Sequence, residues 1–430
     1  MRWFAELGKT SAVLLVLWAI LGVIGYFGGA FPNEAAGGSA QVDDAGPSPL
    51  EDAWAGEDAF MAGEPDAWVE PEDAGTLEAL RSFRACTAPS EIHWALGDLA
   101  GDAEDELVLG CADRVEVVAL PVAGVPARIA RLVPSRAATL RGAAIGDVDA
   151  DQRNDLVLAM ELGLFVVPRD ATGGLGAARA LAPGRHGAVA LGDLDATAGL
   201  DVAVVHGNDP RAELWLFHGG PTPLRGGTAP APVEVAALAV IDLDVDGHLD
   251  VVAVGAQQVL LAFGDSRAGI ARTRSLTPGG AGAVVLDVDG DGAAEVVIER
   301  DGGACVLDPA PALAETADCG ALPSLDPAAR SLQAANEGLI AVRHPDVISW
   351  TPSGTTTSAT LGTTRFGLHR VARDAHGLVL LGSSVDDTGA RQIQLARAPL
   401  GVALRDDEGR TDVVDAPLVL EVVLPDPDAP

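Results

Sequence analysis

The stretch VIDLDVDGHLDVVAVG, residues 240–255, decides the fold. It places an acidic loop, from Asp242 to Asp250, between two short apolar runs. Runs of four to eight residues that are rich in Val and Leu and broken by Gly and Asp are typical of β-strands. The run after the loop is continuously apolar, which predicts a strand in a sheet that is covered on both faces.

The same pattern recurs along the chain. Five segments align on an apolar run, an acidic loop, a second apolar run and, after a short turn, a third one such as ELWLFHGG or QVLLAFGD. The first aspartates of the loops are separated by 49, 46, 49 and 45 residues; they are Asp98, Asp147, Asp193, Asp242 and Asp287. Self-similarity at such a regular period indicates a repeat architecture.

Units of this length, each with several buried strands, predict an all-β fold in which the units are the blades of a β-propeller. The small residues before each loop fit the innermost strand, where the sheets converge. Two further units, from Ser331 and from His369, keep the strand rhythm without the acidic loop. Five and two units predict seven blades, with six or eight as the alternatives. The last apolar run, PLVLEVVL from Pro417, is a candidate for the strand that closes the ring.

The acidic loops have the spacing of metal ligands. In the loop from Asp242, carboxylates stand at positions 1, 3, 5 and 9, a glycine at position 6 allows a sharp bend, and a backbone carbonyl is expected near position 7. Hard cations such as calcium take six to eight oxygen ligands, so the loop suits calcium better than magnesium. An EF-hand needs Glu at position 12 between two helices, whereas position 12 is Ala253 or Ile298 and a strand follows.

These loops resemble the D-x-D-x-D-G-x-x-D loops of FG-GAP or VCBS repeats in integrin-α-like propellers, over roughly residues 77–400. The resemblance implies that calcium braces each blade and that ligands bind elsewhere, on the top or bottom face. Gln152 replaces the family's glycine, Thr197 removes one carboxylate, and Ala100 leaves position 3 empty. Carried over by position, three sets are strong (Asp147, Asp149, Asp151, Asp155; Asp242, Asp244, Asp246, Asp250; Asp287, Asp289, Asp291, Glu295) and two are weaker (Asp193, Asp195, Thr197, Asp201; Asp98, Asp102, Glu106). Acidic turns without metal are the alternative for every set.

The N-terminal region precedes the repeats. Residues 11–27 are uncharged and follow a head with Arg2 and Lys9, so residues 1–30 are expected to be a membrane anchor, or a signal segment that is cleaved. Residues 31–76 lack Lys and Arg and any structural period, which predicts a disordered acidic linker. Positive charge before the helix predicts that the propeller, residues 77–430, lies outside the cytoplasm in the periplasm or at the cell surface, or is secreted after cleavage.

The net charge and the cysteines limit the class of partner and the possible disulfide bonds. The net charge of −34, without a basic stripe, predicts no nucleic-acid partner. Four cysteines in an exported chain allow three disulfide pairings, of which Cys86 with Cys111 and Cys305 with Cys319 is the local one.

No catalytic motif stands out, because the sequence has no HExxH, no P-loop and no Gly-x-Ser-x-Gly. The leading hypothesis is therefore a non-catalytic, calcium-stabilised propeller that binds a protein or glycan in adhesion or as a scaffold. The alternatives are a carbohydrate-active enzyme or enzyme subunit on a propeller scaffold, and a periplasmic envelope assembly factor.

Overall fold

Seven sheets of four or five strands and one two-stranded pair form the described part of the chain. This part runs between residues 78 and 428 of the computed structural model and belongs to one unit, Glu70–Pro430. In this part every regular element is a β-strand. The description omits residues 81, 122–124, 208–211, 233, 266, 268, 290–292, 301–302, 311–319, 323–328, 336–337, 344–345, 352–353, 361–366, 375–376, 386–387, 399–403 and 407–410.

The first five sheets carry the acidic repeats. Blade 1 consists of β3 (Trp94–Gly97), β4 (Glu106–Gly110), β5 (Val115–Ala119), β6 (Ala127–Pro134) and β32 (Val414–Leu424). Blade 2 consists of β7 (Leu140–Gly146), β8 (Asp155–Met160), β9 (Gly163–Val167) and β10 (Arg179–Pro183). Blade 3 consists of β11 (His186–Gly192), β12 (Asp201–His206), β13 (Glu213–His218) and β14 (Leu224–Pro230). Blade 4 consists of β15 (Val235–Ile241), β16 (Asp250–Gly255), β17 (Val259–Gly264) and β18 (Ile270–Leu276). Blade 5 consists of β19 (Gly282–Leu286), β20 (Glu295–Arg300), β21 (Gly303–Leu307) and β22 (Gly320–Ala321).

Two sheets complete the ring. Blade 6 consists of β23 (Arg330–Ala335), β24 (Gly338–Arg343), β25 (Asp346–Thr351) and β26 (Gly354–Thr360). Blade 7 consists of β27 (Gly367–Asp374), β28 (Gly377–Val385), β29 (Arg391–Ala398), β2 (Ser82–Thr87) and β31 (Thr411–Asp412). A separate parallel pair joins β1 (Glu78–Leu80) to β30 (Leu404–Asp406). The predicted all-β propeller of seven blades is confirmed.

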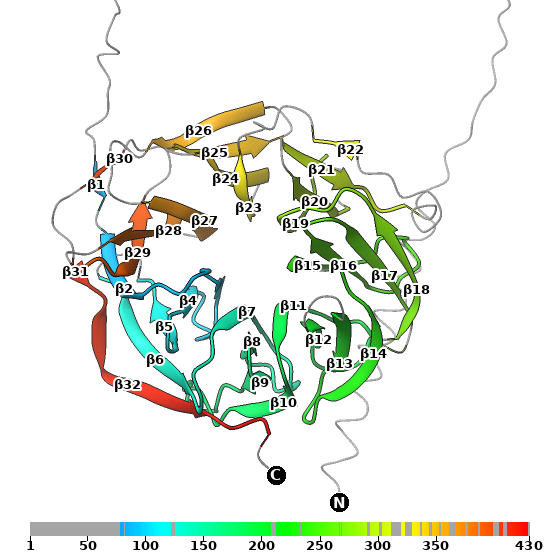
Figure 1. Ribbon diagram of the computed structural model, residues 1–430, viewed down its shortest axis with the longest axis horizontal. Helices are drawn as coiled ribbons and strands as arrows, with labels where there is room; N and C mark the ends of the chain where they lie inside the picture. The colour runs from blue at the N-terminus through cyan, green and yellow to red at the C-terminus, as the bar shows by residue number, and fades with distance from the viewer. Residues whose placement is uncertain are drawn as a thin grey trace, which may run out of the picture. The chain divides into compact units, whose positions relative to one another are not determined.

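The strand before each acidic loop lies at the centre of the ring, as the small residues predict (Figure 1). These inner strands approach one another closely. A Cβ at Gly142 would lie 2.7 Å from the backbone oxygen of Gly187 in the next blade, and a Cβ at Gly192 would lie 2.4 Å from a methyl of Val240. Glycine is therefore required where the sheets converge.

The second strand of each acidic blade is buried along its length, as its continuous apolar run predicts. Every residue of β4, β8 and β16 is buried, and only the last residue of β12 and of β20 is partly exposed. Each of these strands is covered by the neighbouring blades on both faces. Burial at about 25 cal/mol per Å² of apolar surface makes this the main stabilising contribution to the ring.

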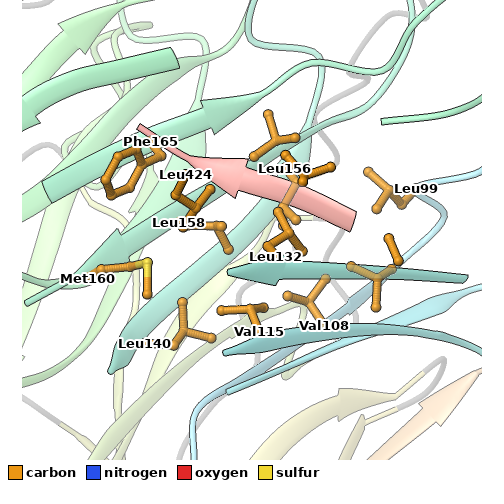
Figure 2. Packing of buried hydrophobic residues seen from close by; sticks show 14 of the residues in the cluster. Leu99, Val108, Val115, Leu132, Leu140, Leu156, Leu158, Met160, Phe165 and Leu424 are labelled. Carbon is orange, nitrogen blue, oxygen red and sulfur yellow. The ribbon is translucent and has the colours of Figure 1, made fainter. Parts of the chain in front are cut away.

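The ring is closed by a strand that the sequence pattern does not reveal. β2 pairs antiparallel with β29 and so completes the last blade with the beginning of the described chain. The run from Pro417 lies in β32 instead, which pairs parallel with β6 at the outer edge of blade 1. In Figure 2 the end of β32 inserts Leu424 into the apolar cluster between blades 1 and 2, beside Leu132 and Leu158.

A disulfide fastens the closure. Cys86 in β2 is bonded to Cys111, which follows β4 of blade 1, so blade 7 is tied covalently to its neighbour. The predicted pairing of these two cysteines is confirmed. Cys305 is also disulfide-bonded, whereas Cys319 lies outside the described residues, so the second predicted pair stays a prediction.

The predicted anchor and linker, residues 1–76, lie outside the described residues. Within the described ranges, the structure contains no helix with the length and apolar character needed to span a membrane.

Candidate metal centres at the acidic loops

The acidic loops all connect the first strand of a blade to its second strand. Each connection is eight residues long, and together they cover residues 98–105, 147–154, 193–200, 242–249 and 287–294. They lie at the same end of the inner strands, because all of these strands point the same way along the axis of the ring. We number loop positions from the first aspartate, so that position 9 is the first residue of the second strand.

The position 9 carboxylate joins the loop to the following hairpin. Asp155 Oδ2 accepts hydrogen bonds from the backbone N–H groups of Val148 at 3.1 Å and Asp149 at 3.2 Å, and its Oδ1 accepts one from Arg169 at 3.1 Å. Equivalent bonds reach the buried carboxylates Glu106, Asp201, Asp250 and Glu295. Position 9 is therefore a structural residue whether or not a metal binds.

The position 1 carboxylate closes the loop on itself. Asp242 accepts from the N–H of Asp246 at 3.1 Å and of Gly247 at 2.9 Å. This path requires the left-handed conformation at positions 4 and 6, where Val245 has φ 56° and Gln152, in the second loop, has φ 67°. A β-branched residue such as Val245 adopts this conformation only under strain. The loop is thus held in one conformation at an energetic cost.

Four of the loops gather groups that could hold a metal ion. In each, one ligand atom from three side chains lies within 4.8 Å of the others; the groups are Asp147, Asp149 and Asp155; Asp242, Asp244 and Asp246; Asp287, Asp289 and Glu295; and Asp195, Asp201 and His218. Among the described residues, Asp151, Asp193 and Asp250 do not join the group of their own loop at this distance. Asp291 lies outside the described residues.

The carboxylate at position 3 has an oxygen that lacks a hydrogen-bond partner. Within the described chain, Asp149 Oδ1 and Asp244 Oδ1 are buried and have no hydrogen-bond partner. A buried polar atom without a partner costs about 1–3 kcal/mol, and more when it carries charge. Both atoms belong to carboxylates that face two further acidic groups, so a hard cation at this point would satisfy the oxygen and reduce the repulsion.

Arginines of the outermost strand of the same blade pair with the position 3 carboxylates. Arg272 in β18 pairs with Asp244, and Arg179 Nη2 in β10 lies 3.6 Å from Asp149 Oδ2. Arg153 pairs with Asp151, which does not belong to the ligand group of its loop. A metal ion would share Asp149 and Asp244 with these arginines or displace them.

The third loop contains a ligand candidate that the sequence pattern misses. His218, at the end of β13, places Nδ1 2.8 Å from Asp195 Oδ2. Aligning ELWLFHGG with QVLLAFGD places His218 opposite Phe263, directly before the residue whose N–H bonds to position 9. Only the fold brings that position against the loop. Thr197 donates its backbone N–H to Asp195 at 2.9 Å.

The first loop is built differently. Asp98 accepts from the backbone of Asp102 at 3.2 Å and of Ala103 at 3.1 Å, and Glu106 accepts from Leu99 at 2.9 Å and Ala100 at 2.7 Å. With no carboxylate at position 3, Asp98, Asp102 and Glu106 form no ligand group among the described residues. This loop has the fold of the others without their donor set.

Burial raises the pKa of the position 9 carboxyls. The pKa of Glu106 rises to about 7 and that of Asp250 to about 6, in both cases mainly because burial disfavours the charged form. Burial likewise raises the pKa of Asp155, Asp201 and Glu295. The pKa of Asp195 is lowered instead, because hydrogen bonds from Thr197 and His218 outweigh its burial.

The loops also connect neighbouring blades. Asn154 Nδ2 in the second loop donates to the backbone oxygen of Asp98 at 2.7 Å, and Leu200 N in the third loop donates to that of Asp147 at 2.7 Å. Any ion that fixes one loop therefore also fixes the contact with the next blade.

Known proteins resemble this chain in structure at low sequence identity. No family model matches the chain, and no curated protein sequence matches it. A structure of BBS1N in complex with ARL6DN aligns at 12% identity over 73% of this chain and 94% of that chain, with a TM-score of 0.46. A chain of the COPII outer coat vertex on membranes aligns at 13% identity over 73% of this chain and 84% of its own, with a TM-score of 0.47. An Agrocybe aegerita lectin that recognises non-reducing terminal N-acetylglucosamine aligns at 15% identity over 51% and 64%, with a TM-score of 0.37.

Proposed function

We propose that this chain is a non-catalytic, calcium-stabilised propeller of the FG-GAP or VCBS type, held outside the cytoplasm, that presents a binding surface to a protein or glycan. The observation that carries the calcium assignment is the pair of buried, unpartnered oxygens, Asp149 Oδ1 and Asp244 Oδ1, at the same position of two loops. Each belongs to a group of three carboxylates whose oxygens converge. An all-carboxylate donor set suits calcium rather than a softer metal.

Calcium would act on stability here. The ligand groups sit on connections between the first two strands of a blade, and these connections bond to the next blade. Binding an ion only to the folded loops shifts the equilibrium toward the folded ring by RT ln(1 + [L]/Kd). The faces of the ring remain available for a partner.

The export assignment is supported by the uncharged segment at residues 11–27, by the positive charges before it and by the disulfide between Cys86 and Cys111. Disulfides persist in oxidising compartments and are rare in the cytosol of most organisms. A binding role fits a sequence that contains none of the catalytic motifs named above.

Titration calorimetry of the chelator-treated full chain with calcium tests the proposal. We expect three or four sites, with at least one site lost in Asp244→Asn, which removes the charge of the carboxylate that has the unpartnered oxygen and keeps its size. Asp113→Asn is the matched control, because Asp113 is an exposed turn residue that pairs only with its neighbour Arg114. Equal stoichiometry in all three proteins, or tighter binding of magnesium than calcium, would contradict the assignment.

A further inference from the structure

A cavity of about 890 Å³ opens at the centre of the ring, lined by residues from all seven blades. Its walls are residues at or just before the start of the inner strands, for example His93, Arg141, Arg185, Val235 and Ala281. The acidic loops follow the other end of the same strands. The cavity therefore opens on the face opposite the candidate metal centres.

In this cavity basic residues outnumber acidic ones, which is the opposite of the chain as a whole. The sequence carries 62 acidic residues against 28 Lys and Arg. The cavity wall holds three glutamates, Glu91, Glu234 and Glu299, against five arginines, Arg141, Arg185, Arg330, Arg370 and Arg391. These arginines come from blades 2, 3, 6 and 7, and we call them the arginine mouth.

Several of these cations are not neutralised by the protein. Arg141 pairs with Glu91 and with Glu161. Within the described chain, Arg185, Arg370 and Arg391 have no carboxylate at ion-pair distance. Three guanidinium groups around one cavity thus lack a counter-ion among the described residues.

Arg391 is held in one orientation. Its Nε donates to Ser383 Oγ at 3.0 Å, and its Nη2 donates to His369 Nε2 at 2.8 Å. Burial lowers the pKa of His369, and the charges of Arg391 and Arg370 lower it further. The histidine is therefore neutral at pH 7 and accepts the hydrogen bond, which leaves the guanidinium as the charged group that faces the cavity.

A second group at the wall lacks a partner. Ser331 is 5% exposed, has φ 56°, and among the described residues its Oγ is buried without a hydrogen-bond partner. A hydroxyl in this state is suited to a polar group from outside the chain. Beside the charged groups the wall holds small residues such as Gly187, Ala188 and Ala281. It also holds three larger apolar ones, Ile92, Val205 and Val235.

We propose that the arginine mouth binds a carboxylated sugar, with the carboxylate on Arg370 and Arg391 and ring hydroxyls on groups such as Ser331. Guanidinium groups match the planar carboxylate, and the lack of a large apolar pocket in the described wall disfavours a hydrophobic peptide anchor. A polyanion would be repelled by the net charge of −34, whereas a single carboxylate that enters the cavity meets mainly the arginines. This inference deepens the proposed function, on which it rests, by assigning the ligand class and the face.

The test is titration of the full chain with D-glucuronate, with D-glucose as the neutral match and N-acetyl-L-glutamate as a carboxylate that is not a sugar. We expect glucuronate to bind, glucose to bind at least about tenfold more weakly, and Arg370→Gln to weaken glucuronate binding about tenfold, since one charge-assisted hydrogen bond is worth such a factor. Within the described chain the Arg370 side chain makes no hydrogen bond or ion pair, so its substitution should leave the fold intact. Ser331→Ala should weaken binding less.

Arg267→Gln removes the same charge from an exposed turn residue away from the cavity wall and should leave binding unchanged. Absence of glucuronate binding, equal binding of glucose, or no effect of Arg370→Gln would overturn the proposal. Equal binding of N-acetyl-L-glutamate would assign the mouth to an acidic peptide side chain instead and also overturn it. Calcium-dependent melting of the same samples separates this failure from failure of the proposed function, because the metal loops lie at the other end of the strands.

Discussion

Blades 1–5 and blades 6–7 differ in how the first strand of the blade is connected to the second. In the first five, eight residues join the inner strand to the second strand, and the second strand begins with a buried acid. In blades 6 and 7 only two residues make the connection, and the second strand begins with Gly338 or Gly377, each with positive φ. A hairpin this short needs glycine, whereas a long loop needs a side chain to organise its backbone.

The difference teaches how the two ends of the ring are used. The long loops place carboxylates at one end of the inner strands, where hydrogen bonds also link neighbouring blades. Blades 6 and 7 have no such loops, yet they contribute Arg330, Arg370 and Arg391 to the cavity at the other end. On the two proposals above, the loops of blades 2–5 serve metal-dependent stability, whereas blades 6 and 7, together with Arg141 and Arg185, serve recognition.

The largest loss of stability should come from replacing the position 9 acid, which blades 6 and 7 lack. Asp155→Ala removes the acceptor of one buried and two partly buried backbone N–H groups. We expect a loss of about 3 kcal/mol in the free energy of unfolding, because an unsatisfied buried donor costs about 1–3 kcal/mol and the partly buried ones add to it. Chemical denaturation measures it. Asp113→Ala, at an exposed turn, should change stability by less than about 0.5 kcal/mol, and equal losses would remove the structural role of position 9.

Removal of the disulfide between blades 7 and 1 should cause the next largest loss of stability. Replacing both Cys86 and Cys111 with serine opens a link between residues 25 apart in sequence. The chain-entropy estimate for such a loop is about 3 kcal/mol. Thermal melting of the double variant, compared with the parent chain, gives the value. A change below about 1 kcal/mol would show that pairing of β2 with β29 closes the ring without covalent help.

The pH dependence of stability should differ between samples in calcium and samples in chelator. The pKa values of Glu106, about 7, and Asp250, about 6, lie above those of the unfolded chain. The ion-free folded state therefore binds protons more readily and loses stability as pH rises from about 4 to about 7. Calcium needs ionised ligands, and the position 9 acids Asp155 and Glu295, whose pKa burial also raises, belong to ligand groups. The stabilising effect of calcium should therefore grow as the pH rises and these two acids ionise.

Melting in EDTA and in calcium at pH 5 and pH 7.5 measures this window. Glu106→Gln should flatten the slope in EDTA, because the variant no longer titrates at position 9 of blade 1. A slope that rises with pH in EDTA would mean that these buried acids are ionised and stabilising without a metal, contrary to the sign given by their raised pKa values.

The smallest effect concerns the weaker third loop. Thr197→Asp supplies the carboxylate that the strong loops have at position 5 and should tighten calcium binding there about fivefold, since charge count tunes the affinity of such loops. Titration calorimetry follows the added site. Ala171→Asp adds the same charge in an exposed turn and should leave affinity unchanged. Equal effects of both variants would indicate that general charge, rather than the loop, sets the affinity.

The blades and their loops could be predicted because their signals are local. Each acidic loop and the apolar run after it lie within about 16 residues, so the period, the buried second strand and the position 9 acid are visible in the sequence. The role of β2 could not be, because SFRACT has no repeat signature and its partner β29 lies some 300 residues away.

Contacts between segments that are far apart in the sequence, within one blade or around the ring, set the other features that sequence reasoning missed. His218 reaches Asp195 only after β13 folds back on the loop, and Arg272 reaches Asp244 from β18. The arginine mouth gathers residues from Arg141 to Arg391, which no local pattern can bring together. The absence of a basic stripe in the sequence is thus compatible with a basic cavity in the fold.

The most direct measurement is calorimetric melting of the full chain in excess EDTA and in about 1 mM calcium. Carboxylate groups that converge on an ion should raise the melting temperature in calcium, by about 2.7 kcal/mol of stability for each site at a hundredfold excess over Kd. Asp149→Asn and Asp244→Asn together should remove much of that rise. An identical melting temperature in both buffers, with no calcium bound, would contradict the assignment of these loops as calcium centres and leave them as hydrogen-bonded connections of the ring.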